Sequence, residues 1–158
     1  MMLEYLIFSC GGFLSHHEKL LIQNCGGRIE IFYILSHRPH GVLTFLRSHD
    51  IWTKARSKRW SDKIESVQLD KWEDEYFDLS ILDGTQWSVR YKLKGNEERT
   101  VSGSNAFPDD WGLFYELMRS IIRKLPNAEK TDIEGVYLTM LKAESGIVGS
   151  SENERRTR

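Results

Sequence analysis

The sequence contains few of the residues that would place it in a specialised class of protein. Its 158 residues include two cysteines and three prolines, and the formal net charge is −1. Two cysteines exclude a disulfide-rich framework. A near-neutral charge argues against a wholly basic nucleic-acid binder and against a wholly acidic mimic. The apolar residues, 40% of the chain, include the aromatic residues, 11% of the chain, and are enough for the core of one domain.

The sequence also lacks the signals of a membrane or secreted protein. No apolar run is long enough to span a bilayer. In the first ten residues no lysine or arginine precedes the apolar run, Glu4 interrupts it, and it is too short for a secretion signal. We therefore expect a cytoplasmic protein that does not contact the membrane.

The first third of the chain predicts an antiparallel meander. Runs of branched and aromatic residues indicate strands at 3–10, 19–24, 28–36 and 42–47, with Gly11-Gly12 as a turn. The apolar residues of the third run do not alternate strictly, which indicates burial on both faces and a central place in the sheet.

Residues 83–125 are the clearest part of the sequence. Strict alternation predicts a strand at 87–93, and a turn at 94–97 leads to a short return strand at 99–103. Apolar residues at three- and four-residue steps predict a helix at 109–125. Asp109 or Asp110 is expected to cap its first turn. A second helix is expected at 53–66.

Together these elements predict an α+β fold. We expect an antiparallel sheet of about five to seven strands with two main helices packed on one face. A single domain is expected at 1–143, followed by a disordered polar tail at 144–158. Within the domain, residues 133–142 are expected to form a last strand or a short helix, and Val136, Tyr137 and Thr139 favour the strand.

Two charge blocks follow one another in the middle of the chain. The first, residues 47–60, carries five basic residues, one acid and two tryptophans. Its candidate binding residues are Arg47, Lys54, Lys58 and Arg59. A basic helix face with an interleaved tryptophan could bind a phosphate backbone and stack bases, or it could be a solvated face whose tryptophan belongs to the core.

The second block, residues 70–83, is acidic. Its candidate binding residues are Asp70, Glu73, Asp74 and Glu75. It could contact a basic partner, ligate a divalent cation, or serve as a solvated connector anchored by Trp72, Tyr76 and Phe77. The spacing of the acids does not fit a calcium-binding loop.

Residues that could carry catalysis or bind a metal are present without a diagnostic spacing. The weak metal candidates are Cys10, His16, His17 and Cys25. They would need Cys10 and Cys25 at adjacent strand ends, and inert thiols are the alternative. A cysteine nucleophile with a histidine base would need only proximity in space, and nothing in the sequence singles out either cysteine. Phosphate-binding, dinucleotide-binding and hydrolase motifs are absent from the sequence, so we expect no cofactor.

One set of residues resembles a known motif. Its positions are Trp72, Asp83, Gly84, Gln86, Trp87, Asn105, Pro108 and Trp111. The set is similar to the pattern W…DGTQW…GSNAYP…W of a family of small uncharacterised bacterial proteins, with Phe107 in place of the usual tyrosine. The resemblance implies a bacterial or phage source and implies no activity. We expect these residues to be structural, with the tryptophans in the core.

The sequence thus favours a non-enzymatic protein that acts by contact with a macromolecule, such as an inhibitor, an immunity protein or an accessory protein. A protein partner is expected. The alternatives are a small hydrolase or metal-dependent enzyme that uses a cysteine–histidine pair or the acidic block, and a nucleic-acid-binding module at residues 47–60. The oligomeric state stays open.

Overall fold

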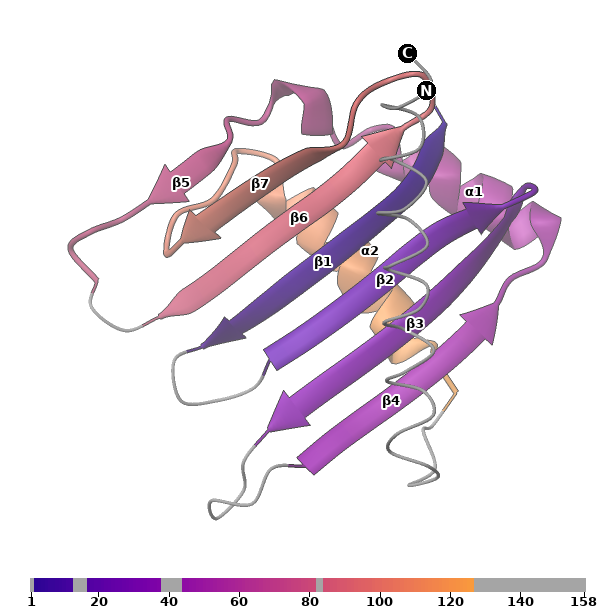
Figure 1. The fold of residues 1–158 in the computed structure, drawn as a ribbon, viewed down its shortest axis with the longest axis horizontal. Coiled ribbons are helices and arrows are strands. Elements are labelled where there is room, and N and C mark those ends of the chain that lie inside the picture. The colour runs from indigo at the N-terminus through magenta and orange to yellow at the C-terminus, as the bar shows by residue number, and fades with distance from the viewer. Residues whose placement is uncertain (1, 13–16, 38–43, 82–83, 127–158) are drawn as a thin grey trace, which may run out of the picture.

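The structure is a computed structural model that describes residues 2–12, 17–37, 44–81 and 84–126, with side chains for all of these except 37 and 44–47. Within these residues, seven strands form one sheet (Figure 1). In chain order they are β1 (Leu3–Gly12), β2 (His17–Cys25), β3 (Arg28–His37), β4 (Thr44–Ile51), β5 (Glu75–Phe77), β6 (Thr85–Leu93) and β7 (Arg99–Ser104). Their order across the sheet is β4-β3-β2-β1-β6-β7-β5.

Strand β1 is the centre of the sheet. It pairs antiparallel with β2 on one side and with β6 on the other, so that Ile7 lies between Leu21 and Arg90. The predicted turn at Gly11-Gly12 is wrong, because both glycines continue β1: Gly11 pairs with His17 and with Gln86. The central strand thereby joins the amino-terminal meander to the β6–β7 hairpin.

In the same described residues, two α-helices cover one face of the sheet, behind it in Figure 1. Helix α1 (Lys54–Ile64) is capped by Thr53, whose hydroxyl accepts a hydrogen bond from the Arg56 amide at 3.2 Å. Helix α2 (Trp111–Arg123) lays Phe114, Leu117, Met118 and Ile121 into the core. Burying each such side chain stabilises the fold by about 1.5–3 kcal/mol. A short 3-10 turn, η2 (Leu69–Lys71), follows α1.

The α+β class and the two helices on one face are therefore confirmed, with corrections in the strands. Strand β4 continues to Ile51, four residues beyond its predicted end. Strand β5 lies in the segment expected to be a connector, and it pairs parallel to β7 in an otherwise antiparallel sheet. The predicted element at 133–142 and the tail at 144–158 lie outside the described residues.

The sheet is buried on both faces along its amino-terminal strands. On one face, the side chains of the strands pack with those of the helices in the main core. A second, separate cluster consists of Tyr5, Ile7, Leu21, Phe32 and Ile34. The expectation that the third strand is buried on both faces is confirmed, but its expected central place is wrong, because β3 lies next to the edge strand β4. None of the described helices is long and apolar enough to cross a membrane.

Candidate interaction surfaces

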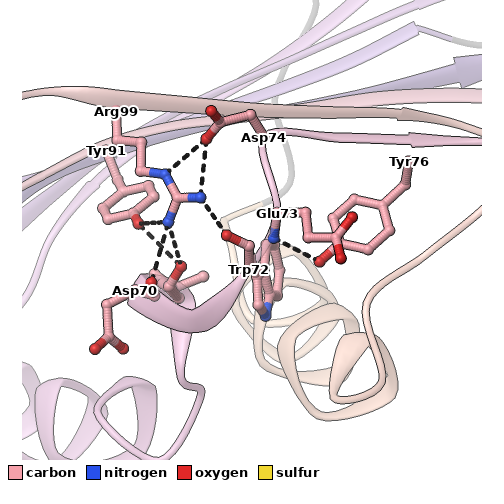
Figure 2. Close-up of polar contacts among 8 residues, drawn as sticks. Asp70, Trp72, Glu73, Asp74, Tyr76, Tyr91 and Arg99 are labelled. Atoms are coloured by element: carbon pink, nitrogen blue, oxygen red, sulfur yellow. Dashed lines mark hydrogen bonds and ion pairs between the residues drawn. The ribbon is translucent and has the colours of Figure 1, made fainter.

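Arg99 holds the start of the acidic block against the sheet (Figure 2). Its Nη1 donates to the carbonyl oxygens of Leu69 and Asp70, each at 3.2 Å, and its Nη2 donates to the carbonyl of Trp72. Nε and Nη2 also donate to Asp74 Oδ1, at 3.0 and 2.9 Å. One guanidinium on β7 thus binds three backbone carbonyls and one carboxylate of the connecting segment.

The acidic residues differ in their contacts and in their exposure. Asp74 is bound by Arg99, and Asp78 accepts hydrogen bonds from the Ser80 amide at 3.0 Å and hydroxyl at 2.5 Å, which lower the pKa of its carboxyl. The Glu73 and Glu75 side chains are exposed, and no ion pair is found for either among the described residues. Their negative charge is therefore available to a partner.

Exposed apolar side chains follow directly after these acids. Phe77 is 57% exposed, Leu79 90% and Ile81 45%. The expectation that Phe77 anchors the segment is therefore wrong, whereas Trp72 is buried and Tyr76 half-buried, as an anchoring role requires. We call Glu73, Glu75, Phe77, Leu79 and Ile81 the β5-edge surface.

The backbone of β5 adds hydrogen-bonding groups to this surface. The Asp74 carbonyl and the Asp78 amide bond β7, so by alternation the groups of Glu75 and Phe77 point away from it. Within the described residues no strand pairs with that outer side, and Figure 1 shows β5 at the border of the sheet.

The basic block is divided by the fold. The main chain of Arg47 lies in β4, but its side chain is outside the described residues. Lys54, Lys58 and Arg59 are exposed on α1, where Lys58 pairs with Asp62. A groove of about 160 Å³ between α1 and α2 is lined by Arg56, Arg59, Lys63 and Lys124, together with Trp52, Trp60, Ser120 and Ile121.

The tryptophans of the basic block cannot stack on bases. Trp52 and Trp60 are both buried and meet edge to face, with ring centroids 6.4 Å apart. The Arg56 guanidinium lies over the Trp52 ring at 4.0 Å and 3.6 Å from Asp50. Trp60 therefore lies in the core, which the alternative of a solvated basic face expects.

The residues of the motif form an aromatic cluster where the sheet meets α2. Trp87 lies 4.5 Å from Trp111 and 6.0 Å from Trp72 between ring centroids. Its indole N–H donates to the Ala106 carbonyl at 2.9 Å. Gly103 leaves room for this ring, because a Cβ at that position would lie 2.3 Å from Trp87 Cε2. Trp72 and Trp87 are core residues, as expected, whereas Trp111 is half-buried and packs against the core.

The polar members of the motif shape the loops around that cluster. Asn105 adopts φ +58°, and its side-chain oxygen accepts a hydrogen bond from the Thr85 amide at 2.8 Å. A Cβ on Gly84 would lie 1.8 Å from that oxygen. Gln86 donates to the Ser104 hydroxyl at 2.7 Å, and Pro108 is buried. Asp83 lies outside the described residues.

The predicted aspartate cap of α2 is wrong. Asp110 occupies the cap position, but its carboxylate accepts from the Trp72 indole at 2.6 Å and from the Gln68 amide at 3.0 Å. Asp109 is exposed. The carboxylate of Asp110 therefore ties the helix start to η2 instead of satisfying its own helix.

The fold separates the candidate metal ligands. Cys10 pairs with Glu18 near the start of β2, whereas Cys25 ends the same strand, about 23 Å further along. The adjacent strand ends that a metal site would need are therefore not formed. His17 lies beside Gly11, and His16 is outside the described residues. No cluster of three or more metal-ligating side chains occurs in the described part of the chain.

Cys10 lies beside a half-buried ion pair. Arg119 on α2 binds the Glu18 carboxylate with both Nη atoms, one at 2.8 Å, and the Tyr33 hydroxyl donates to the same carboxylate at 2.8 Å. Burial raises the pKa of the Cys10 thiol, and the negative charge of Glu18 raises it further. A raised thiol pKa opposes the thiolate that a nucleophile needs. Cys25 is exposed, and its pKa is also raised.

Sequence reasoning missed Arg99, the Glu18–Arg119 pair and the exposure of Phe77, Leu79 and Ile81. The one local signal was the alternation of Phe77, Leu79 and Ile81 with polar residues, in a segment for which a solvated connector was one interpretation. Comparison with known proteins adds no function, because no family model, no curated protein and no solved structure matches the chain. The resemblance to a bacterial family stays a prediction.

Proposed function

We propose that this protein is a binding protein that contacts a protein partner through the β5-edge surface. The observation that carries the proposal is the exposure of Phe77, Leu79 and Ile81 next to acids without a described partner. Large apolar side chains inside a polar rim are typical of interaction sites. The proposal agrees with the acidic block as a contact for a basic partner.

Three features define the partner chemistry. Glu73 and Glu75 favour a basic segment and speed its association. Phe77, Leu79 and Ile81 offer apolar anchors. The outward backbone groups of β5 can bond an extended chain, as sheet edges do in strand addition. An extended peptide segment with basic and apolar residues satisfies all three.

Arg99 supports this function by holding the segment in one conformation. A surface that is ordered before binding loses less conformational entropy when the partner arrives. The guanidinium donates to the carbonyls of Leu69, Asp70 and Trp72. The sheet, through Arg99, therefore fixes where β5 begins.

Site-specific photo-crosslinking tests the proposal. A benzoylphenylalanine in place of Leu79, expressed in the source organism, is expected to give a covalent adduct with a partner after irradiation. The matched control carries the same group in place of Glu97, which is exposed in the turn between β6 and β7. No adduct from position 79, or the same adducts from both positions, would overturn the proposal.

A second candidate is an anionic ligand in the α1–α2 groove. Arg56, Arg59, Lys63 and Lys124 line the groove without a carboxylate among the lining residues. With both tryptophans buried, the contact would be to phosphates and not to bases.

Fluorescence anisotropy of a labelled oligonucleotide tests this candidate. Binding at low salt that weakens with salt and is lost in Arg59→Glu with Lys63→Glu would favour it. Unchanged anisotropy with single-stranded and double-stranded probes would remove it.

A further inference from the structure

The groove between α1 and α2 gathers cations for which the described chain supplies no carboxylate. Its volume is about 160 Å³, and every residue that lines it belongs to the described part of the chain. Arg59, Lys63 and Lys124 line it with exposed side chains, and none of the three forms an ion pair within the described residues. By contrast, Arg119 and Arg123 each bind a carboxylate. Three positive charges therefore border one cavity without a described counter-ion.

The ends of the helices explain only part of this arrangement. Lys63 lies in the last turn of α1 and Lys124 directly follows α2, and a helix C-terminus favours a cation without any ligand. Arg59 lies in the middle of α1, so this reason does not apply to it. Arg56, the fourth cation of the groove, already lies 3.6 Å from Asp50.

The same groove is lined by a residue whose polar group is unsatisfied. The indole N–H of Trp60 is buried and has no hydrogen-bond partner within the described residues. Buried donors are nearly always paired, so an unpaired one calls for an acceptor. An oxygen atom bound at the floor of the groove would be such an acceptor, and the cations around it favour an oxygen that carries negative charge.

The size of the groove limits the ligand to one anionic group. A water molecule takes up about 30 Å³ of the liquid, so the groove has room for roughly five waters, or for one phosphate with a short organic group. The free cations do not continue along α1, because Lys58 is paired with Asp62. A phosphate monoester carries a charge of about −1.5 to −2 at pH 7, whereas each phosphate of a nucleic-acid backbone carries one charge. Three cations around one small cavity therefore match a monoester better than a diester.

We propose that the α1–α2 groove binds the terminal phosphate of a small phosphate monoester, or phosphate itself, through Arg59, Lys63, Lys124 and the Trp60 indole N–H. The ligand then bridges the two helices, since two of the cations come from α1 and the third directly follows α2. The inference rests on the basic lining that carries the second candidate function, but it names a different kind of ligand. Failure of the oligonucleotide probe would concern phosphodiesters and would leave this inference standing.

Titration of the full-length protein with methyl phosphate, followed in ¹H–¹⁵N correlation spectra at constant ionic strength, tests the proposal. We expect saturable shifts of the Trp60 indole signal and of the Ile121 and Lys124 amides. Dimethyl phosphate carries one charge and is expected to bind about tenfold more weakly or worse. Tighter binding of inorganic phosphate than of methyl phosphate would identify the free ion as the ligand, and the reverse order an ester. The absence of saturable shifts with both, or equal binding of methyl and dimethyl phosphate, would overturn the proposal.

Two variants of equal charge locate the binding. Lys63→Ala with Lys124→Ala removes two cations of the groove, and Lys54→Ala with Lys71→Ala removes two exposed lysines that do not line it. The first variant is expected to bind methyl phosphate about tenfold more weakly, and the second within about twofold of the wild type, because distant charges are screened. All four lysines are exposed, so both variants should fold. Equal affinities of the two variants would overturn the proposal.

Discussion

Arg99 illustrates how one residue can organise a surface. It is bonded to the carbonyls of Leu69, Asp70 and Trp72 and to the Asp74 carboxylate. These partners precede it by 25 to 30 residues. The sequence contains no local sign of the contact, because backbone carbonyls are present at every position.

We predict that Arg99→Ala lowers the free energy of unfolding by about 1.5–3 kcal/mol, since charged hydrogen bonds to several carbonyls are lost. Arg99→Lys should recover less than half of this loss, because an ammonium cannot reproduce the planar fork. Urea unfolding measures both values.

The control for this prediction is Arg123→Ala. It removes an exposed pair with Glu116 and should stay within about 0.5 kcal/mol of the wild type. Equal losses for Arg99→Ala and Arg123→Ala would show that the Arg99 contacts are not stabilising.

Gly103 gives a second prediction at the residue scale. Gly103→Ala places a Cβ 2.3 Å from the Trp87 ring and should destabilise the fold by about 1–3 kcal/mol. Gly112→Ala is the matched control, because its Cβ meets nothing within 4 Å and alanine favours a helix. Thermal unfolding of the two variants should therefore shift in opposite directions, and a stabilised Gly103→Ala would contradict the close approach.

At the scale of elements, periodicity predicted the long strands and both helices because their apolar faces are buried. It failed at the two edges of the sheet. The end of β4 contains Ser48, His49 and Asp50, polar residues that edge strands commonly carry. Strand β5 has three residues, which are too few to show an alternation of apolar and polar side chains. Its pairing with β7 also depends on residues far along the chain.

The start of α2 shows the same limit. An aspartate before a helix usually caps it, yet Asp110 bonds Gln68 and Trp72 because the fold brings η2 against it. Local sequence indicates which hydrogen bonds a side chain can make within its own element. For Asp110, the tertiary contact with η2 determines which hydrogen bonds form.

We predict that Asp110→Ala lowers the free energy of unfolding by about 1–3 kcal/mol, because a buried indole N–H and a backbone amide lose their acceptor. Asp109→Ala, at an exposed neighbouring position, should change it by less than about 0.5 kcal/mol. Guanidinium unfolding measures the difference. Equal effects would mean that helix capping, and not the tie to η2, explains these aspartates.

At the scale of the whole molecule, the two charge blocks lie on different parts of the sheet. The basic residues of α1 belong to a helix that contacts β3, and the acidic residues border β5 at the opposite edge of the sheet. Figure 1 shows this separation of α1 and β5. The sequence predicted that the blocks are distinct, but it could not show that the acidic one carries exposed apolar residues, because exposure depends on the whole fold.

The central claim is that the β5-edge surface binds a protein partner, and a comparative pull-down from the source organism tests it most directly. The tagged protein is compared with two variants at low and moderate salt. One carries Glu73→Lys, Glu75→Lys and Phe77→Ser; the other, a control of equal charge reversal, carries Lys54→Glu and Lys58→Glu. We predict a protein captured by the wild type and by the α1 variant, weakened by salt, and lost by the β5-edge variant. Capture of the same proteins by all three, or loss only with the α1 variant, would contradict the account.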